Sequence, residues 1–367
     1  MKKQLLCTSA IALGVAAAPA AAQEWNLDWG GFMSQHVGFG DISGTAIPAG
    51  VDPEGDGVDI HSTSEIIFSP SVTLDNGMTF GINVQLEGEQ TAADIDETYM
   101  SISSDTFGRV DIGSENSAGY KSMVGAPGVT SMYINSPSTS TFIPWTGTGT
   151  AIGFRQAALS SYTEVAGNND VQRISYYTPD FNGLTVGVSY APTGAVNAAN
   201  SFSVNKNAVL SDIFDIGMNY SNSFGATDIT LSARWGTGDT PVAGFSDPET
   251  WGLGFQVGFN NITVGGSYTE NDNGAPAGTA DQEGWSFGAT YDAAGPWSFE
   301  ALTYQGEVDL GGAASLDREA YRIGASRTLG PGVDWDIYLL QEERDFNVTA
   351  GTDAEGTVLG TAINLSF

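Results

Sequence analysis

The sequence predicts an all-β protein, a 16-stranded antiparallel transmembrane β-barrel, and three observations carry this prediction. Apolar and polar residues alternate with a period of two over most of the chain. Short turns and longer connections alternate between these stretches. Beyond its first residues the chain has no apolar run of 18 residues, so it offers no helix that could cross a membrane. Barrel strands need no such run, because their side chains alternate between lipid and lumen.

The period of two is clearest in residues 78–87. Every even position from Met78 to Leu86 is apolar, and every odd position from Thr79 to Glu87 is small or polar. A helix cannot use this period, whereas a strand with one apolar face can. The same alternation continues to the last residue, Phe367. We therefore expect one face of each strand to contact lipid.

Tight turns are expected on one side of the barrel and longer loops on the other. The tight turns are expected at Asp75, Asp105, Pro179, Gly225, Asn260, Gly295 and Gly330. This difference in length is typical of outer-membrane barrels, whose periplasmic turns are short. An even number of strands places both termini on that side, so that the first and last strands can pair. Closure matters because an open edge would leave unpaired amides in lipid.

Two soluble folds compete with the barrel, a pair of β-sandwiches and a β-propeller. The face opposite the apolar one is rich in Gly, Ser, Thr, Asn and Gln, which are too small and polar for a packed core. Aromatic residues concentrate towards strand ends, as in interfacial girdles, for example at Trp25, Trp29, Trp251 and Trp285. No blade-length repeat is present. The barrel is therefore the favoured fold.

Residues 1–22 are expected to be a cleaved signal peptide, which leaves 23–367 as the barrel. Lys2 and Lys3 precede an apolar stretch and a run of alanines that ends at Ala22. The alternative, a helical anchor, needs about 20 apolar residues. Cleavage removes Cys7, the only cysteine. It also leaves ten basic residues against 43 acidic ones, a balance that disfavours nucleic acid as a partner.

The connection over about 115–170 breaks the alternation. A long segment without strands inside a compact fold is usually functional. It carries apolar residues able to pack, and a short helix is expected over 152–159. A barrel of this size has a lumen wide enough to hold a loop. We expect an inward-folded constriction loop; the alternative is a mobile external loop.

Strand parity assigns charged side chains to the lumen. The expected constriction residues are Arg109, Asp111, Glu115, Glu164, Arg173, Arg234 and Arg322. Arginines on the wall would face carboxylates on the loop, and the field between them would orient polar solutes. The alternative is that these charges point inward only because lipid excludes them.

Metal binding and catalysis have little support in the sequence. Asp52, Glu54, Asp56 and Asp59 alternate in one connection and supply oxygen ligands suited to Ca²⁺. They lack the full signature of a calcium loop, so a solvated loop is the alternative. No other cofactor is expected. Catalytic motifs of hydrolases are absent from the sequence, so no enzyme is expected.

Three stretches resemble the Gram-negative general porins, particularly those of alphaproteobacteria. Residues 96–103 and 107–116 are similar to the run that leads into the third loop of that family. Residues 176–190 are similar to the hairpin that follows the loop, and Phe367 resembles the family's C-terminal assembly signal. The strand count extends the resemblance over the mature chain.

The resemblance implies a homotrimer in the outer membrane that lets small hydrophilic solutes and ions diffuse through a water-filled channel. Outer-membrane lipid, lipopolysaccharide and the barrel-assembly machinery are the other expected partners. The acidic composition adds an expectation of cation preference. Two alternatives stay open, a substrate-selective channel, for instance for sugars, and a structural or adhesive surface barrel.

Overall fold

The structure, a computed structural model, describes residues 24–44, 54–88, 94–135, 142–143, 154–194, 206–207, 209–347 and 353–367, without the side chains of 54–56 and 94. The expected signal peptide lies outside the described residues. Within these ranges, no helix has both the length and the apolar character needed to span a membrane.

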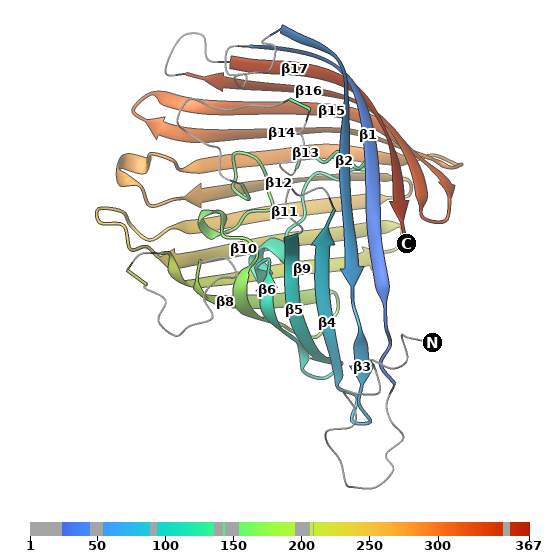
Figure 1. The fold of residues 1–367 in the computed structure, drawn as a ribbon, viewed down its shortest axis with the longest axis vertical. Coiled ribbons are helices and arrows are strands. Elements are labelled where there is room, and N and C mark those ends of the chain that lie inside the picture. Colours follow the sequence, from blue (N-terminus) through green and yellow to red (C-terminus); the bar gives the residue numbers. More distant parts are fainter. Residues whose placement is uncertain are drawn as a thin grey trace.

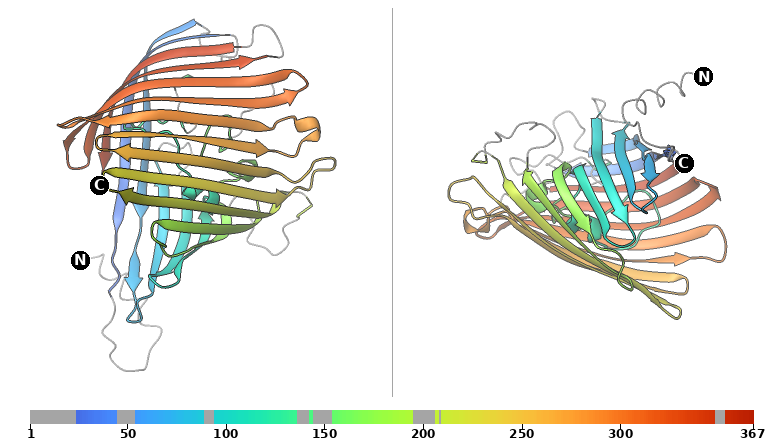
Figure 2. Two further views of the ribbon diagram at one scale, coloured as in Figure 1. Left: turned by 180° about the vertical axis from the view of Figure 1, so that it is seen from behind. Right: turned by 90° about the horizontal axis from the view of Figure 1, so that it is seen from below.

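The strands form one closed barrel in which all neighbours are antiparallel (Figure 1; Figure 2 shows two further views). Each strand pairs with the next one in sequence. The ring closes where β1 (Trp29–Gly44) pairs with β17 (Asp353–Ser366), from Phe32 opposite Ser366 to Gly44 opposite Ala354. Closure removes the open sheet edges that lipid would not tolerate. The predicted closed antiparallel barrel is confirmed.

The barrel has the 16 strands predicted, although one of them is interrupted. β2 (Glu54–Phe68) and β3 (Ser71–Thr73) both pair with β4 (Thr79–Glu87) and are two parts of one strand. The break lies at Ser69 and Pro70, and proline has no backbone N–H for the ladder. The Pro70 carbonyl still accepts a bond from Ile82 N at 2.9 Å, so the interruption stays short.

The remaining strands follow in chain order around the ring. They are β5 (Asp94–Ser104), β6 (Gly108–Glu115), β7 (Val171–Tyr177), β8 (Leu184–Thr193), β9 (Ser211–Phe224), β10 (Thr227–Asp239), β11 (Glu249–Phe259), β12 (Ile262–Asp272), β13 (Gln282–Asp292), β14 (Trp297–Gly311), β15 (Ala314–Gly330) and β16 (Val333–Phe346). The tight turns fall where they were predicted, between β3 and β4, β5 and β6, and then every second pair up to β15 and β16. One connection on the other side is also tight, because only Gly312 and Ala313 join β14 to β15, where a longer loop was expected.

Side chains alternate between the two faces of the wall, as the period of two predicts. Apolar residues at outward positions are half exposed in the isolated barrel, for example Leu253 at 54% and Ile323 at 59%. The inward neighbour Arg322 is 2% exposed. A continuous aliphatic and aromatic outer face would be costly in water, and lipid covers it in an outer-membrane barrel.

The C-terminal residue is tied into the wall. Gly31 N donates to Phe367 O at 3.2 Å, and Phe367 N donates back to Gly31 O at 3.1 Å. The turn before β16 packs beside the same end. Gly332 has φ of +67°, and a Cβ there would lie 2.1 Å from Ser366 O, so only glycine fits this turn.

Carboxylates gather on the outer face at the strand ends far from the C-terminus. Successive strands place like charges directly opposite one another, at Glu283, Glu307, Asp317, Asp345 and Asp353. All are at least partly exposed. Residues 345, 353 and 355 belong to the ends of strands, β16 and β17, and not to the connection between them. Part of the acidity therefore lies on the barrel exterior.

The chain between β6 and β7 folds into the barrel, as predicted. It contains α2 (Ala118–Ser122) and the short 3₁₀ turn η2 (Val165–Gly167). The expected helix over 152–159 is not formed at 154–159, which are turns and irregular backbone; residues 152 and 153 lie outside the described residues. Helix α2 begins instead at Ser117, whose side chain accepts from Tyr120 N at 3.1 Å.

Candidate pore constriction

The segment over 116–170, hereafter the inner segment, is fastened to the inner wall by side chains of the strands. Its first part crosses β10 to β16. The backbone donors and wall acceptors are Val124 with Ser232, Ala126 with Ser286, Val129 with Glu300, and Ser131 with Asp336, at 2.6–3.0 Å. An irregular backbone inside a barrel needs such partners, because its N–H groups have no ladder of their own.

The returning part of the inner segment is held by longer polar side chains. The contacts are Ala157 N with Asn271 Oδ1 at 2.7 Å, Ala158 N with Gln282 Oε1 at 3.0 Å, Leu159 O with Arg318 Nη1 at 3.1 Å, and Ala157 O with the Tyr304 hydroxyl. These four acceptors and donors lie on four consecutive strands, β12 to β15. Both parts therefore lie on the same side of the lumen.

Glycines on the wall make room for this backbone. A Cβ at Gly254 of β11 would lie 1.9 Å from Val124 O. At Gly284 of β13 it would lie 2.0 Å from Ala157 O. The wall thus has a groove without side chains into which carbonyls of the inner segment fit. This explains why glycine takes inward positions that face no turn.

An apolar cluster inside the barrel completes the attachment. Met132, Ile134, Phe142 and Ile143 of the inner segment are at most 5% exposed. They pack with wall residues of β14 to β17, among them Leu302, Tyr304, Tyr338, Leu340 and Val358. Burial of apolar side chains against the wall stabilises the inward conformation. A mobile external loop would leave these side chains in water.

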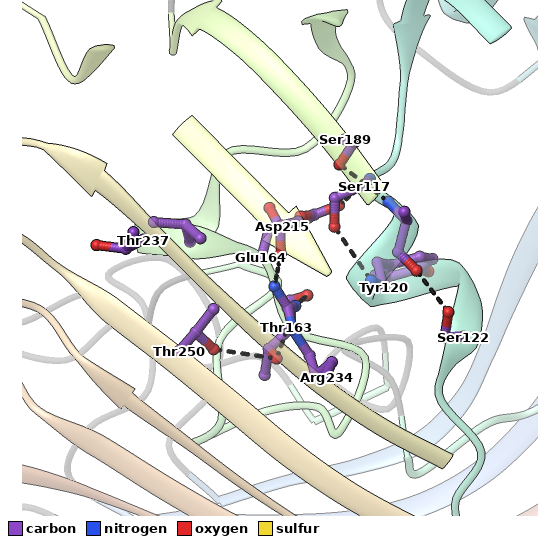
Figure 3. A network of polar contacts seen from close by, with 12 residues as sticks. Ser117, Tyr120, Ser122, Thr163, Glu164, Ser189, Asp215, Arg234, Thr237 and Thr250 are labelled. Atoms are coloured by element: carbon purple, nitrogen blue, oxygen red, sulfur yellow. Dashed lines mark hydrogen bonds and ion pairs between the residues drawn. The ribbon is translucent and has the colours of Figure 1, made fainter. Parts of the chain in front are cut away.

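Charged groups of the wall and of the inner segment meet beside helix α2 (Figure 3). Arg234 of β10 donates to Asp215 of β9 and to the Thr163 carbonyl. Glu164 accepts from Ser117 N at 2.7 Å. Burial raises the pKa of the Glu164 carboxyl, while Arg173 and Arg234 act against this shift. The network joins the start and the end of the inner segment.

Three further ion pairs on the wall are buried. Arg322 of β15 pairs with Glu300 of β14 at 2.7 Å, and Glu300 also accepts from Val129 N. Glu342 of β16 lies between Arg318 and Arg344, with Arg318 Nε at 3.1 Å. A buried charge needs such a partner. Glu300 therefore both neutralises Arg322 and holds the inner segment.

The remaining expected residues pair in other ways. Lys121 Nζ of the inner segment lies 2.5 Å from Glu115 Oε2 at the end of β6. Arg109 pairs with Asp111 of the same strand, and the Arg109 side chain is 44% exposed. Arg173 donates to Asn168 O at 3.0 Å. Of these groups only Arg109 presents much charge to the lumen.

The arrangement differs from the expected basic wall facing loop carboxylates. Arg234 and Arg322 pair with carboxylates of neighbouring strands, and Glu115 is a wall residue whose cation comes from the inner segment. The alternation along each strand predicts which charged residues face the lumen. It does not predict their depth in the barrel or their partners, because these depend on how neighbouring strands are aligned.

The sequence analysis missed several residues that carry the attachment. They are Asp215, Glu300, Arg318, Asp336, Glu342 and Arg344. Each lies on the inward parity of its strand and is at most 5% exposed. Extending the alternation along β15 and β16 to their far ends would have found the arginines. Their link to the inner segment had no signal in the sequence.

Metal binding is not supported by the described residues, which contain no group of three or more His, Asp or Glu side chains placed to hold an ion. Of the calcium candidates, Asp52 lies outside the described residues, and so do the side chains of Glu54 and Asp56. Asp59 lies on β2 and is exposed.

Carboxylates gather instead on the side of the lumen opposite the attachment. Burial, then Asp96 and Glu97, raise the pKa of Asp170 to about 7, and Arg155 acts against this shift. Asp170 ends the inner segment, just before β7. This side of the lumen therefore carries titratable negative charge near neutral pH.

A closed barrel with a lipid-facing exterior, narrowed from within by a segment bonded to its wall, defines a channel of the outer membrane. The profile of the Gram-negative porin family matches residues 8–347. The chain belongs to the Gram-negative porin family and is an outer-membrane β-barrel protein. Proteins of this family are channels rather than enzymes. No curated protein matches the sequence.

Solved outer-membrane proteins share the fold at low sequence identity. The anion-selective porin from Comamonas acidovorans is 16% identical, with a TM-score of 0.61 over 94% of this chain and 100% of that one. The trimer form of OmpT from Vibrio cholerae is 12% identical, with a TM-score of 0.63 over 94% and 99%. The outer membrane channel DcaP of Acinetobacter baumannii is 12% identical, with a TM-score of 0.62 over 96% and 100%.

Proposed function

We propose that the protein lets small hydrophilic solutes and ions diffuse passively through a water-filled path beside the inner segment. The attachment of that segment along β8–β17 supports this proposal most directly, because polar side chains on the inner face of β2, β4 and β5 remain partly exposed. Examples of these inward side chains are Thr63, Asn83, Gln85 and Ser101. They are small or uncharged, which suits unselective passage of polar solutes.

Swelling of proteoliposomes in isotonic solutions of neutral solutes tests this function. The rate of swelling should fall steeply as solute size increases from a pentose to a trisaccharide, because a narrowed pore sieves by size. Liposomes that hold the folded protein but do not swell with any solute would support a structural or adhesive barrel instead. No catalytic role is proposed.

We also propose that the channel prefers cations. The arginines at the wall are neutralised by adjacent carboxylates. By contrast, the carboxylates of Glu65, Asp96, Glu97 and Asp170 lie close together and outnumber the cations beside them. A negative lumen concentrates cations and depletes anions. The name of the Comamonas relative records anion selectivity for that protein, so the sign is open to direct measurement in this one.

Reversal potentials under a KCl gradient show whether the channel prefers cations or anions. The Debye length is about 10 Å at 0.1 M salt and about 3 Å at 1 M, so fixed charge should act across the lumen in dilute salt only. We expect a cation-selective potential that shrinks as salt rises. An anion-selective potential in dilute KCl at neutral pH would contradict the charge argument.

The partners proposed are two further copies of the chain, lipopolysaccharide and the barrel-assembly machinery. The outward carboxylates at Glu283, Glu307, Asp345 and Asp353 lie at the strand ends far from the C-terminus, where divalent cations would have to bridge them to the anionic head groups of lipopolysaccharide. Exposed Phe367 at the opposite end supports recognition during assembly. Cross-linking in intact membranes should give trimers, and a monomer alone would exclude them.

A further inference from the structure

Arg155 is held in place on the inner segment by two aromatic rings. Its Cζ lies 4.7 Å from the centre of the Tyr120 ring and 4.8 Å from the centre of the Phe154 ring. The guanidinium also donates from Nη1 to the Tyr120 hydroxyl. A cation close to an aromatic face is attracted by the quadrupole of the ring, so both rings favour this position. These contacts fix where the positive charge of Arg155 lies.

The backbone around Arg155 is shaped to present this side chain. Arg155 has φ of +58°, a left-handed conformation that few residues other than glycine adopt. The Arg155 carbonyl accepts from Glu164 N at 2.8 Å. Gly167 fits against the carbonyl of Phe154, where a Cβ would lie only 2.7 Å away. Such a backbone conformation persists only where its surroundings hold it, and it is found most often at functional sites.

Arg155 also differs from the other arginines of the lumen in its pairing. The buried arginines of β10, β15 and β16 each form an ion pair with a carboxylate. Within the described ranges, Arg155 makes no ion pair, and it is partly exposed. Its charge therefore acts on ions in the water nearby, over a Debye length of about 10 Å at 0.1 M salt.

Carboxylates lie near the guanidinium of Arg155. Burial and neighbouring carboxylates raise the pKa of Asp170, and Arg155 opposes this rise, so the two charges are close enough to interact. Asp96 of β5 lies within range of the same guanidinium. Next to them, Glu97 Oε1 accepts from Asn116 Nδ2 at 2.6 Å, just before helix α2. The cation thus lies on the inner segment and two of the carboxylates lie on a strand, the reverse of the arrangement expected from the sequence.

We propose that Arg155 is a selectivity-determining residue of the channel, whose charge limits the preference for cations that Asp96, Glu97 and Asp170 produce. One fixed positive charge beside three negative ones makes the local potential less negative without changing its sign. The rings of Tyr120 and Phe154 are positioning groups, because they keep that charge at one place in the lumen. This inference rests on the proposed cation-preferring channel and names the residue that sets the degree of the preference.

Reversal potentials of the reconstituted mature chain under a KCl gradient test this role at pH 8, where Asp170 is largely ionised. R155Q removes the charge and should raise the ratio of potassium to chloride permeability about threefold in dilute KCl, because charges a few ångströms apart interact appreciably even in water. R155K keeps a cation and should stay near the unaltered ratio. R155Q/D170N removes one charge of each sign and should return the ratio close to that of the unaltered protein.

R327Q is the matched control for the loss of an arginine. Arg327 also lies near an aromatic ring, with its Cζ 5.5 Å from the centre of the Trp297 ring, but it is on the outward face of β15. R327Q should therefore leave the permeability ratio unchanged.

A second variant, R155C, separates the charge of the side chain from its size. The mature chain has no other cysteine, because Cys7 lies in the expected signal peptide. A cationic methanethiosulfonate reagent should restore the unaltered ratio in R155C, whereas a neutral reagent of similar size should not. Equal effects of the two reagents would contradict the proposal.

The possible results separate this inference from the function beneath it. A folded protein that passes no ions would overturn the proposed channel. A conducting, cation-preferring channel whose permeability ratio is the same in R155Q as in the unaltered protein would overturn the role of Arg155 alone. An equal rise of the ratio in R327Q would assign the effect to the overall charge of the protein and would also contradict the proposal.

Discussion

Glu300 shows at the scale of one residue how the barrel holds its inner segment. Its carboxylate accepts from Val129 N at 2.6 Å and from Thr130 Oγ1 at 2.8 Å, and it pairs with Arg322. The Glu300 residue is only 5% exposed. The sequence predicted that residues of this parity face inward. It could not predict the partners, because these come from a segment 170 residues away.

Replacing Glu300 by alanine should therefore do more than remove one bond. Arg322 would remain buried without its counter-charge, and removal of one partner of a buried pair costs about 3–5 kcal/mol. The free energy of unfolding in detergent should fall by that amount. E307A is the control, because Glu307 lies on the same strand, faces outward and is exposed; it should change the free energy by less than about 0.5 kcal/mol. Equal effects of the two variants would exclude the role assigned to Glu300.

Asp170 gives the lumen a response to pH near neutrality. Its pKa is raised to about 7 by burial and by Asp96 and Glu97. Because the folded state holds this proton more tightly, the carboxyl's contribution to stability is complete below about pH 4 and is lost as pH rises through about 7. The lumen correspondingly gains a negative charge over the upper part of this window.

Cation preference should consequently weaken when the pH falls from 8 to 6, well above the usual range for carboxyl groups. Reversal potentials in dilute KCl measure this change. D170N should reduce this change, while D105N, a change of the same kind in the exposed turn between β5 and β6, should not. A pH response that D170N leaves intact would assign the titration to another group.

At the scale of elements, strands were predictable and the inner segment only in part. Alternation and turn residues identify a strand locally, so the turns fell where they were predicted. The short helix expected over 152–159 is not formed at 154–159. Ser117 before Ala118 was the better signal, because serine is a preferred N-cap. The path of the segment depends on wall groups far away in sequence.

The glycine groove allows a test of that path. In G254A the new Cβ would lie 1.9 Å from Val124 O, so the backbone of the inner segment must move away from the wall and into the lumen. We expect a lower single-channel conductance and a stability loss of about 1–3 kcal/mol. G258A is the matched control on the same strand and face, where the nearest atom is 3.4 Å away. If G254A left both quantities unchanged, the segment would not lie in this groove.

At the scale of the whole molecule, the closed barrel followed from pattern alone. Each strand has lipid on one side and water on the other, so apolar and polar residues alternate along every strand. Each strand therefore adds the same kind of evidence for the barrel. The distribution of charge did not follow in the same way. Part of the acidity lies outside the lumen, because Glu307, Glu343 and Glu355 lie on outward positions of strand ends. Sequence parity does not say where a strand leaves the membrane.

The central claim is that the inner segment narrows an open, water-filled lumen, and single-channel conductance in a planar bilayer tests it most directly. The mature chain should insert in discrete conducting steps. A variant that lacks 125–150 should fold in detergent and conduct in larger steps, because the part of the segment that crosses β10–β16 is gone. Steps of unchanged size from the folded deletion variant would place the segment outside the conducting path and contradict the account.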